Sequence, residues 1–92
     1  MESLHSGGTL LVDGVPLSYT SEDLKRIFSA YGTVTWARLV SDHMGMSLGF
    51  GYVGLTNDVE IDAALAALHG KHLCGRLLKI VRAAPPPLPR RA

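Results

Sequence analysis

The chain has one cysteine, little net charge and no long hydrophobic run. Cys74 has no partner for an internal disulfide, which favours a reducing, intracellular setting. No apolar run approaches the roughly 20 residues that span a bilayer, and residues 1–8 lack the pattern of a secretory signal. We therefore expect a soluble protein with no membrane role, cytoplasmic if bacterial and nuclear or cytoplasmic if eukaryotic.

The charge is also unevenly distributed. Nine Lys and Arg stand against eight Asp and Glu, but residues 85–92 supply two of the arginines and no acid. The remainder is therefore near −1. Binding to duplex nucleic acid by phosphate neutralisation alone is disfavoured by this balance, because such proteins carry a basic patch.

The 92 residues, 47% of them hydrophobic, are enough for one small folded domain. Thr20 and Asn57 are predicted helix N-caps, and Gly32 and Gly70 are predicted to end those helices. Between and around the helices lie runs of β-branched and apolar residues. The predicted order is strand, helix, strand, strand, helix, strand, with strands at residues 9–13, 34–40, 48–55 and 76–83. This order is typical of the ferredoxin-like α+β fold.

The third predicted strand carries the most informative pattern. Phe50 and Tyr52 are two positions apart, so both rings face the same side of the sheet. Val53 has the opposite parity and would face the helices, which leaves the rings for solvent or ligand rather than core. Glycines at 49, 51 and 54 suggest that a ligand, such as a stacked base, needs close access to the backbone and rings.

The octamer at residues 48–55, Leu-Gly-Phe-Gly-Tyr-Val-Gly-Leu, resembles the ribonucleoprotein octamer of the RNA recognition motif (RRM) family. The hexamer at residues 10–15 is similar to the family's second motif, and the resemblance covers about residues 9–84. It implies a four-stranded antiparallel sheet of order 4-1-3-2 with two helices on one face. It also implies that the other face binds single-stranded RNA, with single-stranded DNA as a further ligand, and that Phe50 and Tyr52 stack on bases.

Two departures from the family pattern weaken that expectation. Leu11 stands where the hexamer usually has a stacking aromatic, so we expect apolar contact with a base but a weaker site. Leu48 and Leu55 replace the basic and aromatic ends of the octamer. These aliphatic residues, with the low charge, leave a protein-interaction module as the alternative function.

Four further residues have outward positions in the predicted strands. Trp36 would add a third ring beside the octamer, unless a bulge turns it to the sheet edge or into the core. Arg38 and Lys79 are candidates for contact with phosphate or a base edge, or are ordinary solvated charges. Asp13 could accept from a base amino or imino group, or could simply form an Asp-Gly turn.

The remaining signals do not predict catalysis. His69, His72 and Cys74 are metal-ligand types close in sequence, but no second cluster completes a tetrahedral site, and we expect no metal and no other cofactor. No catalytic arrangement is apparent, so the chain is predicted not to be an enzyme. Residues 1–8 are expected to be flexible. Residues 85–92 form a proline-rich basic tail whose P-x-x-P-x-R and P-P-L-P sequences match SH3 and WW ligands, or a plain linker. A monomer is expected.

Overall fold

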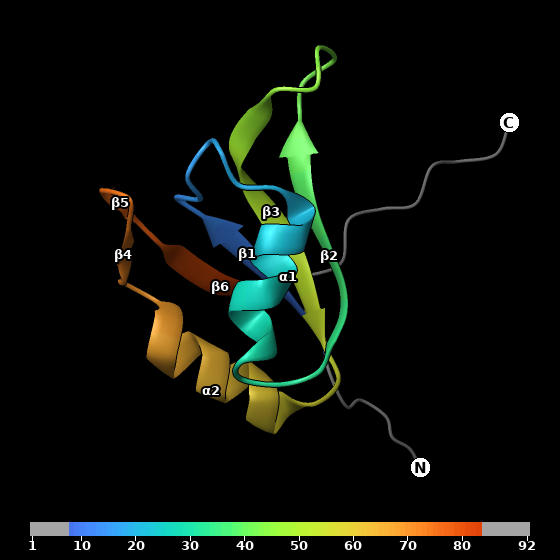
Figure 1. The fold of residues 1–92 in the computed structure, drawn as a ribbon. Helices are drawn as coiled ribbons and strands as arrows, with labels where there is room; N and C mark the ends of the chain where they lie inside the picture. Colours follow the sequence, from blue (N-terminus) through green and yellow to red (C-terminus); the bar gives the residue numbers. More distant parts are fainter. Residues whose placement is uncertain (1–7, 84–92) are drawn as a thin grey trace, which may run out of the picture.

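The computed structural model describes residues 8–83, which fold into two layers, one of helices and one of β-sheet (Figure 1). Among these residues no helix is long and apolar enough to cross a membrane. The elements of the main fold are β1 (Gly8–Asp13), α1 (Ser21–Ser29), β2 (Val34–Ser41), β3 (Ser47–Leu55), α2 (Asp58–Leu68) and β6 (Lys79–Ala83). A small hairpin of β4 (His72–Leu73) and β5 (Arg76–Leu77) lies between α2 and β6.

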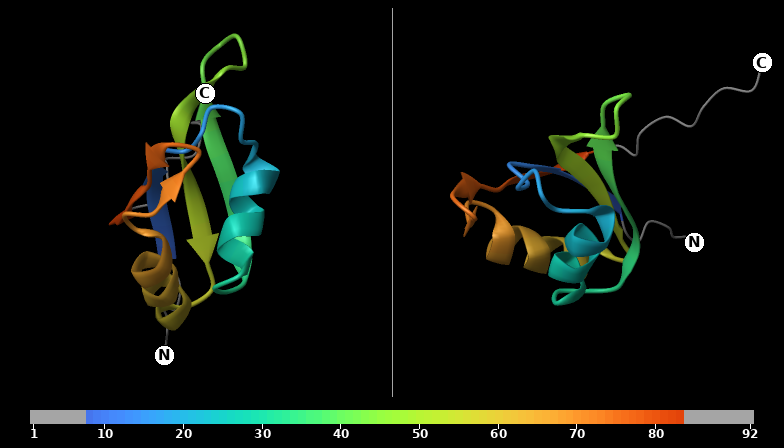
Figure 2. Two further views of the ribbon diagram at one scale, coloured as in Figure 1. Left: turned by 60° about the vertical axis from the view of Figure 1, so that its left-hand side comes forward. Right: turned by 45° about the horizontal axis from the view of Figure 1, so that its top comes forward.

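The main sheet has four antiparallel strands in the order β2-β3-β1-β6. Since β6 is the fourth strand of this sheet, the predicted order 4-1-3-2 is confirmed. Both helices lie on the same side of the sheet (Figure 2). The two central strands of the sheet are β1 and β3. The two-layer, ferredoxin-like prediction is therefore confirmed.

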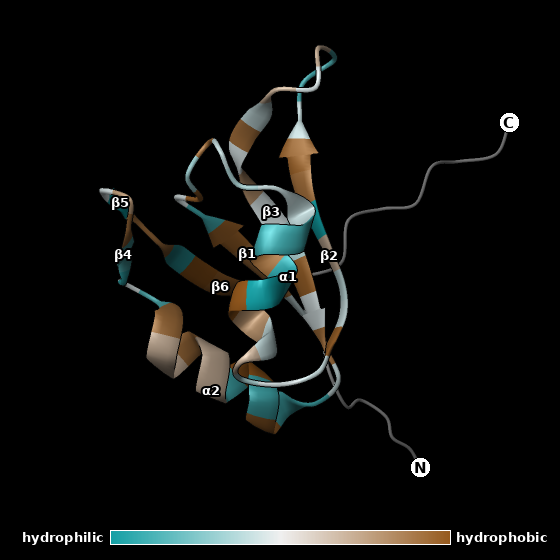
Figure 3. Ribbon diagram, viewed as in Figure 1, coloured by the Kyte–Doolittle hydropathy of each residue, from teal (hydrophilic) through white to brown (hydrophobic). Residues whose placement is uncertain are grey.

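The core lies between the helices and the sheet. Apolar residues on the inward parity of β1, β3 and β6 are buried there against one face of each helix, and Figure 3 shows hydrophobic residues along these strands. Every second side chain of these strands therefore points into the core, and the side chains between them point to the opposite face of the sheet. The fully buried side chains include Leu10, Val12, Val15, Leu24, Phe28, Val53, Ile61, Leu68 and Leu78.

Both helices begin at the predicted N-caps. Thr20 and Asp23 form a capping box: the Asp23 N–H donates to the Thr20 hydroxyl, and the Asp23 carboxylate accepts from the Thr20 N–H. At α2, the Glu60 N–H donates to Asn57 Oδ1 at 2.9 Å. The Glu60 carboxylate does not complete a second box. It accepts instead from the hydroxyl and N–H of Thr56.

The predicted role of Gly32 at the end of the first helix is wrong. That helix ends at Ser29 with Ala30 as its C-cap, in the right-handed helical region. A Cβ atom at position 32 would lie 2.6 Å from side-chain carbons of Glu60, so close approach of α2 accounts for the glycine. Gly70, by contrast, has φ +83° directly after the C-cap His69, as predicted for the second helix.

The predicted strand at residues 76–83 is in fact two elements. Cys74 and Gly75 both have positive φ, which forms a tight turn and folds Arg76–Leu77 back onto His72–Leu73. The Leu78 N–H then donates to the Lys71 carbonyl at 2.9 Å, so this backbone still faces the hairpin. Pairing with β1 begins only at Lys79, which is the strand partner of Asp13.

Candidate nucleic-acid interface

The sheet face away from α1 and α2, here called the open face, carries all seven residues predicted from the sequence to bind RNA. Strand register places them in cross-strand rows, because directly paired residues project to the same side. In one row Arg38, Tyr52 and Leu11 follow one another across β2, β3 and β1, and Val81 of β6 completes it. In the next row Phe50, Asp13 and Lys79 follow one another across β3, β1 and β6.

Phe50 and Tyr52 occupy the centre of this face. Both are only half-buried, whereas their neighbours Gly51 and Val53 are buried on the helix side. Phe50 pairs with Asp13 and Tyr52 pairs with Leu11, so β1 separates the rings from β6. The outward orientation deduced from alternation is therefore what the structure has. Two aromatic rings on adjacent outward positions can each support one planar ligand group by stacking.

The glycines beside these rings have a different role from the one predicted. A Cβ atom on Gly51 would overlap with the backbone carbonyl of Arg38 and lie 2.9 Å from Leu39 Cα, so the close approach of β2 requires this glycine. Gly49 has φ +84°, and its carbonyl accepts from the Val15 N–H at 2.9 Å, which ties the chain after β1 to the start of β3. These glycines fit neighbouring segments of the same chain and need no ligand to explain them.

Trp36 lies on the open face despite a strand irregularity. The register between β2 and β3 shifts between Val34 and Trp36, so the bulge considered from the sequence is present. Trp36 nevertheless pairs with Gly54, and a Cβ atom on Gly54 would overlap with Nε1 and Cδ1 of the indole. The half-buried indole therefore lies over Gly54, one outward position beyond Tyr52 along β3. A third ring thus borders the two central ones.

The cations of the open face lie at its two edges. Arg38 on β2 and Lys79 on β6 are both exposed. Within residues 8–83 the side-chain ion pairs involve other residues, Arg26 with Asp23 at 3.0 Å and Arg82 with Asp58 and Asp62 at 3.3 and 2.8 Å. Arg38 and Lys79 can therefore reach a ligand that crosses the rings without breaking a described ion pair.

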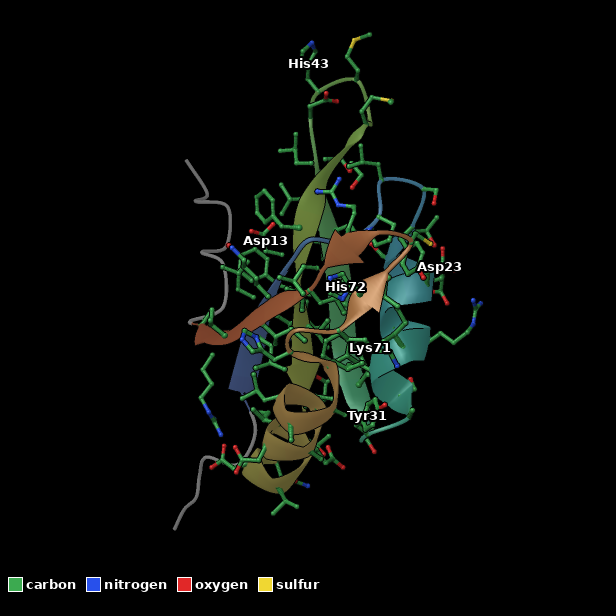
Figure 4. The ribbon with its side chains drawn as sticks, turned by 90° about the vertical axis from the view of Figure 1, so that its left-hand side faces the viewer. Asp13, Asp23, Tyr31, His43, Lys71 and His72 are labelled. Atoms are coloured by element: carbon green, nitrogen blue, oxygen red, sulfur yellow. The ribbon has the colours of Figure 1, made fainter. Side chains whose placement is uncertain are left out.

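Asp13 has the turn-forming role considered from the sequence, and its contact with a base stays a prediction. Its Oδ1 accepts from the Gly14 N–H at 2.8 Å, which is the turn-forming contact. It is also exposed at the end of β1, directly between Phe50 and Lys79. Figure 4 shows its side chain on the side of the sheet opposite α1, which carries Asp23. The turn thus fixes a carboxylate on the open face.

The ionisable groups with shifted pKa values belong to the scaffold. Hydrogen bonds from the Thr20 backbone and hydroxyl, together with Arg26, lower the pKa of Asp23. The Thr56 hydroxyl, with backbone N–H groups, lowers the pKa of Glu60, while Asp62 and Asp58 raise the pKa of Arg82. These groups cap helices or join α2 to β6, so they hold the sheet in place without lining the open face.

The histidine and cysteine cluster does not assemble into a metal centre within the described part of the chain, where no group of three metal-ligating side chains is found. His69 has a structural contact instead: its Nδ1 accepts from the backbone N–H of Ile80 at 2.9 Å. This bond joins the end of α2 to β6. Cys74 is exposed in the hairpin turn.

The sequence interpretation missed one exposed apolar residue of the open face. Val81 is 50% exposed and pairs with Leu11, so it extends the apolar row onto β6. The same alternation that gave Lys79 an outward position gives it to Val81 as well. Leu48, 51% exposed, lies at the outer end of β3 with the same parity as Phe50. Leu55, however, is only 2% exposed and belongs to the core, so it does not contribute to this surface.

Comparison with known proteins agrees with this architecture. The model of the RNA recognition motif family matches residues 10–79. The chloroplastic RNA-binding protein CP31B of Arabidopsis thaliana is 43% identical over 72 residues, covering 77% of this chain and 25% of that protein. The putative RNA-binding protein RbpE of Nostoc sp. is 38% identical over 78 residues, covering 84% of this chain and 79% of that protein. The chain belongs to the RRM family.

Solved structures give the same result. A Sxl-lethal protein/RNA complex is similar with a TM-score of 0.81 and 28% sequence identity, over 89% of this chain and 50% of that one. The lengths of the relatives differ: this chain spans a quarter of CP31B but more than three quarters of RbpE.

Proposed function

We propose that this RRM binds single-stranded RNA on its open face, with bases stacked on Phe50 and Tyr52. The observation that carries the proposal is the pair of half-buried rings on a central strand, facing away from both helices. Base stacking on an aromatic side chain contributes about 1–3 kcal/mol per base and tolerates any base, since every base has a π-face. The names of the relatives, which describe RNA-binding proteins, support the same ligand class.

The neighbouring residues have distinct proposed roles. Arg38 beside Tyr52, and Lys79 at the opposite edge, contact phosphate or the edge of a base. Leu11 and Trp36 extend the apolar platform on either side of Tyr52. Because unstacked bases must lie flat on these side chains, single strands bind and duplexes, whose bases are stacked on one another, do not. The proposed activity is binding without catalysis.

The alternative function, a protein-interaction surface, is favoured by one specific observation. Val81 is about half exposed on the same face as Leu11, which itself replaces an aromatic of the family motif, and Leu48 is about half exposed at the outer end of β3. An aliphatic surface of this kind fits apolar side chains of a partner protein better than it fits bases. RNA is the preferred ligand because the rings lie at the centre of the face and the aliphatic residues lie around them.

The proposal extends to the wider context of the chain. Residues 9–84 form the binding unit, acting as a monomer inside the cell. The proline-rich residues 85–92 and the segment 1–8 lie almost entirely outside the described residues, so the SH3 or WW ligand in the tail stays a prediction. Binding of single-stranded DNA is expected only where contacts to the RNA 2′-hydroxyl are dispensable.

The test is a titration of ¹⁵N-labelled full chain with a pool of short RNA oligomers. RNA binding on the open face predicts amide shifts concentrated in β1 and β3, around Leu11, Phe50 and Tyr52, with the outer face of α1 unchanged. An equimolar pool of the same oligomers annealed to their complements is the matched control and should give small shifts. If single strands leave β1 and β3 unshifted, the proposal is wrong and the protein-interaction function becomes the better one.

A further inference from the structure

Asp13 is an unexpected side chain on a surface that binds RNA, because a carboxylate repels phosphate. It lies in the row Phe50, Asp13, Lys79, with the ring on one side and an ammonium group on the other. Adjacent strands are about 4.8 Å apart, so a base stacked on Phe50 that extends toward β6 reaches Asp13 first and Lys79 next. The ligand group at this point must satisfy an acceptor and a donor together.

The carboxylate of Asp13 is also held in a fixed orientation. The Gly14 N–H donates to its Oδ1 at 2.8 Å. Gly14 itself has φ +83°, and a Cβ atom there would overlap with the carbonyl oxygen of Leu77, so the turn admits only glycine. Among the described residues this is the hydrogen bond given for the Asp13 carboxylate, so Oδ2 and the second lone pair of Oδ1 are available to accept from a ligand. Such preorganisation lowers the entropy cost of ligand binding.

The charges of the pair disfavour a phosphate at this point. Asp13 and Lys79 are neighbours of opposite charge, so their fields largely cancel at a distance. A phosphate would be attracted by one and repelled by the other. A neutral group with both donors and acceptors gains from both side chains. The edge of a base is such a group, whereas Arg38, at the other edge of the sheet and in none of the ion pairs of residues 8–83, is better suited to phosphate.

The four bases differ in what they offer this pair. A carboxylate only accepts, and its two oxygens match two adjacent donors. Guanine has adjacent N1–H and N2–H₂ donors, with the O6 acceptor beside them for an ammonium group. Adenine offers a single amino group flanked by acceptors that a carboxylate repels, and cytosine offers a single amino group with the N3 acceptor beside it. Uracil offers one N3–H between two carbonyl oxygens. Guanine is the only base whose Watson–Crick edge has two adjacent donors.

We infer that Asp13 and Lys79 together read the Watson–Crick edge of a guanine stacked on Phe50, so that the preferred ligand is a guanine-containing single strand. The inference rests on the proposed RNA binding and adds base selectivity to it. Asp13 accepts from N1–H and N2–H₂, and the Lys79 ammonium donates to O6. A charge-assisted bidentate contact of this kind discriminates against wrong bases by about fivefold to a hundredfold.

The experiment measures affinities for octauridine and for the same oligomer with one central guanosine, adenosine, cytidine or inosine. The parent chain should bind the guanosine oligomer about tenfold more tightly than the adenosine or cytidine oligomer. Inosine lacks the 2-amino group but keeps N1–H and O6. The affinity for the inosine oligomer should therefore lie between that for the guanosine oligomer and those for the adenosine and cytidine oligomers. Equal affinity for guanosine and inosine would overturn the assignment of Asp13 to the 2-amino group.

Variants locate the selectivity. Asp13→Asn keeps an oxygen acceptor for the Gly14 N–H but no longer offers two acceptors, so guanosine preference should fall to within about twofold while octauridine still binds. Lys79→Met should weaken the preference in part. Glu22→Gln removes one negative charge from an exposed position on α1 and should leave the guanosine preference unchanged.

Two further outcomes overturn the inference, and they are distinguishable. If every oligomer binds and shifts the amides of Phe50 and Tyr52, but guanosine preference is absent or persists in Asp13→Asn, the base-reading role is wrong and RNA binding stands. If no oligomer shifts those amides, RNA binding itself fails and the inference fails with it.

Discussion

The indole of Trp36 occupies the space in front of Gly54 that any side chain at position 54 would need. The two residues are strand partners, and Trp36 follows a register shift in β2. The third ring of the open face is therefore positioned by a glycine on the strand that carries the other two. Trp36 is also the single tryptophan of the chain, which makes its emission a specific reporter of this contact.

Gly54→Ala should displace the Trp36 indole, because the new Cβ atom would overlap with its Nε1 and Cδ1 atoms. We expect a red shift of tryptophan emission as the ring becomes more exposed, while the far-ultraviolet circular dichroism stays unchanged. Gly8→Ala is the matched control, since the nearest atom there is the flexible Cδ1 of Ile61 at 3.2 Å. Identical emission in the parent and in Gly54→Ala would show that the indole does not lie on Gly54.

His69→Ala should destabilise the domain by about 1–3 kcal/mol, because the N–H of the buried Ile80 would lose its acceptor. His69→Asn should recover most of this loss, since the Asn side-chain oxygen occupies nearly the position of Nδ1. Urea unfolding followed by circular dichroism measures both. Equal destabilisation by the two substitutions would contradict the hydrogen-bond role.

The stability of the domain should fall in acid partly through Glu60. Its pKa is lowered from the ordinary 4.5, chiefly by the Thr56 hydroxyl. A carboxyl group with a lowered folded-state pKa stabilises the fold above its unfolded pKa, and this contribution is lost as pH falls through the folded value. The urea midpoint should therefore fall as the pH is lowered below about 4.5, and it should fall less steeply in Glu60→Gln. Thr56→Val should give an intermediate slope, and equal slopes in all three proteins would contradict the assignment.

Much of the open face could be predicted from the sequence because alternation is a local property. The two-residue spacing of Phe50 and Tyr52 fixes their common side whatever the neighbouring strand is. The same rule placed Asp13, Arg38 and Lys79 correctly. Likewise Thr20 and Asn57 cap their helices through contacts within three residues, which a local pattern encodes.

Features that depend on contacts between distant segments could not be predicted in this way. Gly32 and Gly51 are required by the close approach of α2 and β2, not by their own backbone angles. His69 was considered as a metal ligand, but its partner is eleven residues away on another element. The hairpin turn at Cys74 and Gly75 was overlooked, because the short strands it joins lack a clear alternating pattern.

Leu11→Phe should increase RNA affinity, because it places a ring beside Tyr52 where the family motif usually has one. One additional stacked base contributes about 1–3 kcal/mol, so we expect a gain of about fivefold to a hundredfold. Leu11 is only half-buried on the open face, so the substitution requires little repacking and the urea midpoint should change little. Fluorescence anisotropy with a labelled oligomer measures the gain. Val81→Phe, one strand further out in the same row, is the positional control and should have a smaller effect.

The affinity of Tyr52→Ala for single-stranded RNA, compared with that of Tyr52→Phe, tests the central claim most directly. Tyr52→Phe keeps the ring and should bind within about twofold of the parent. Tyr52→Ala removes the ring and should bind about fivefold to a hundredfold more weakly, with unchanged circular dichroism and urea midpoint. Unchanged affinity in a folded Tyr52→Ala would contradict base stacking on this strand, and with it the proposed use of the open face.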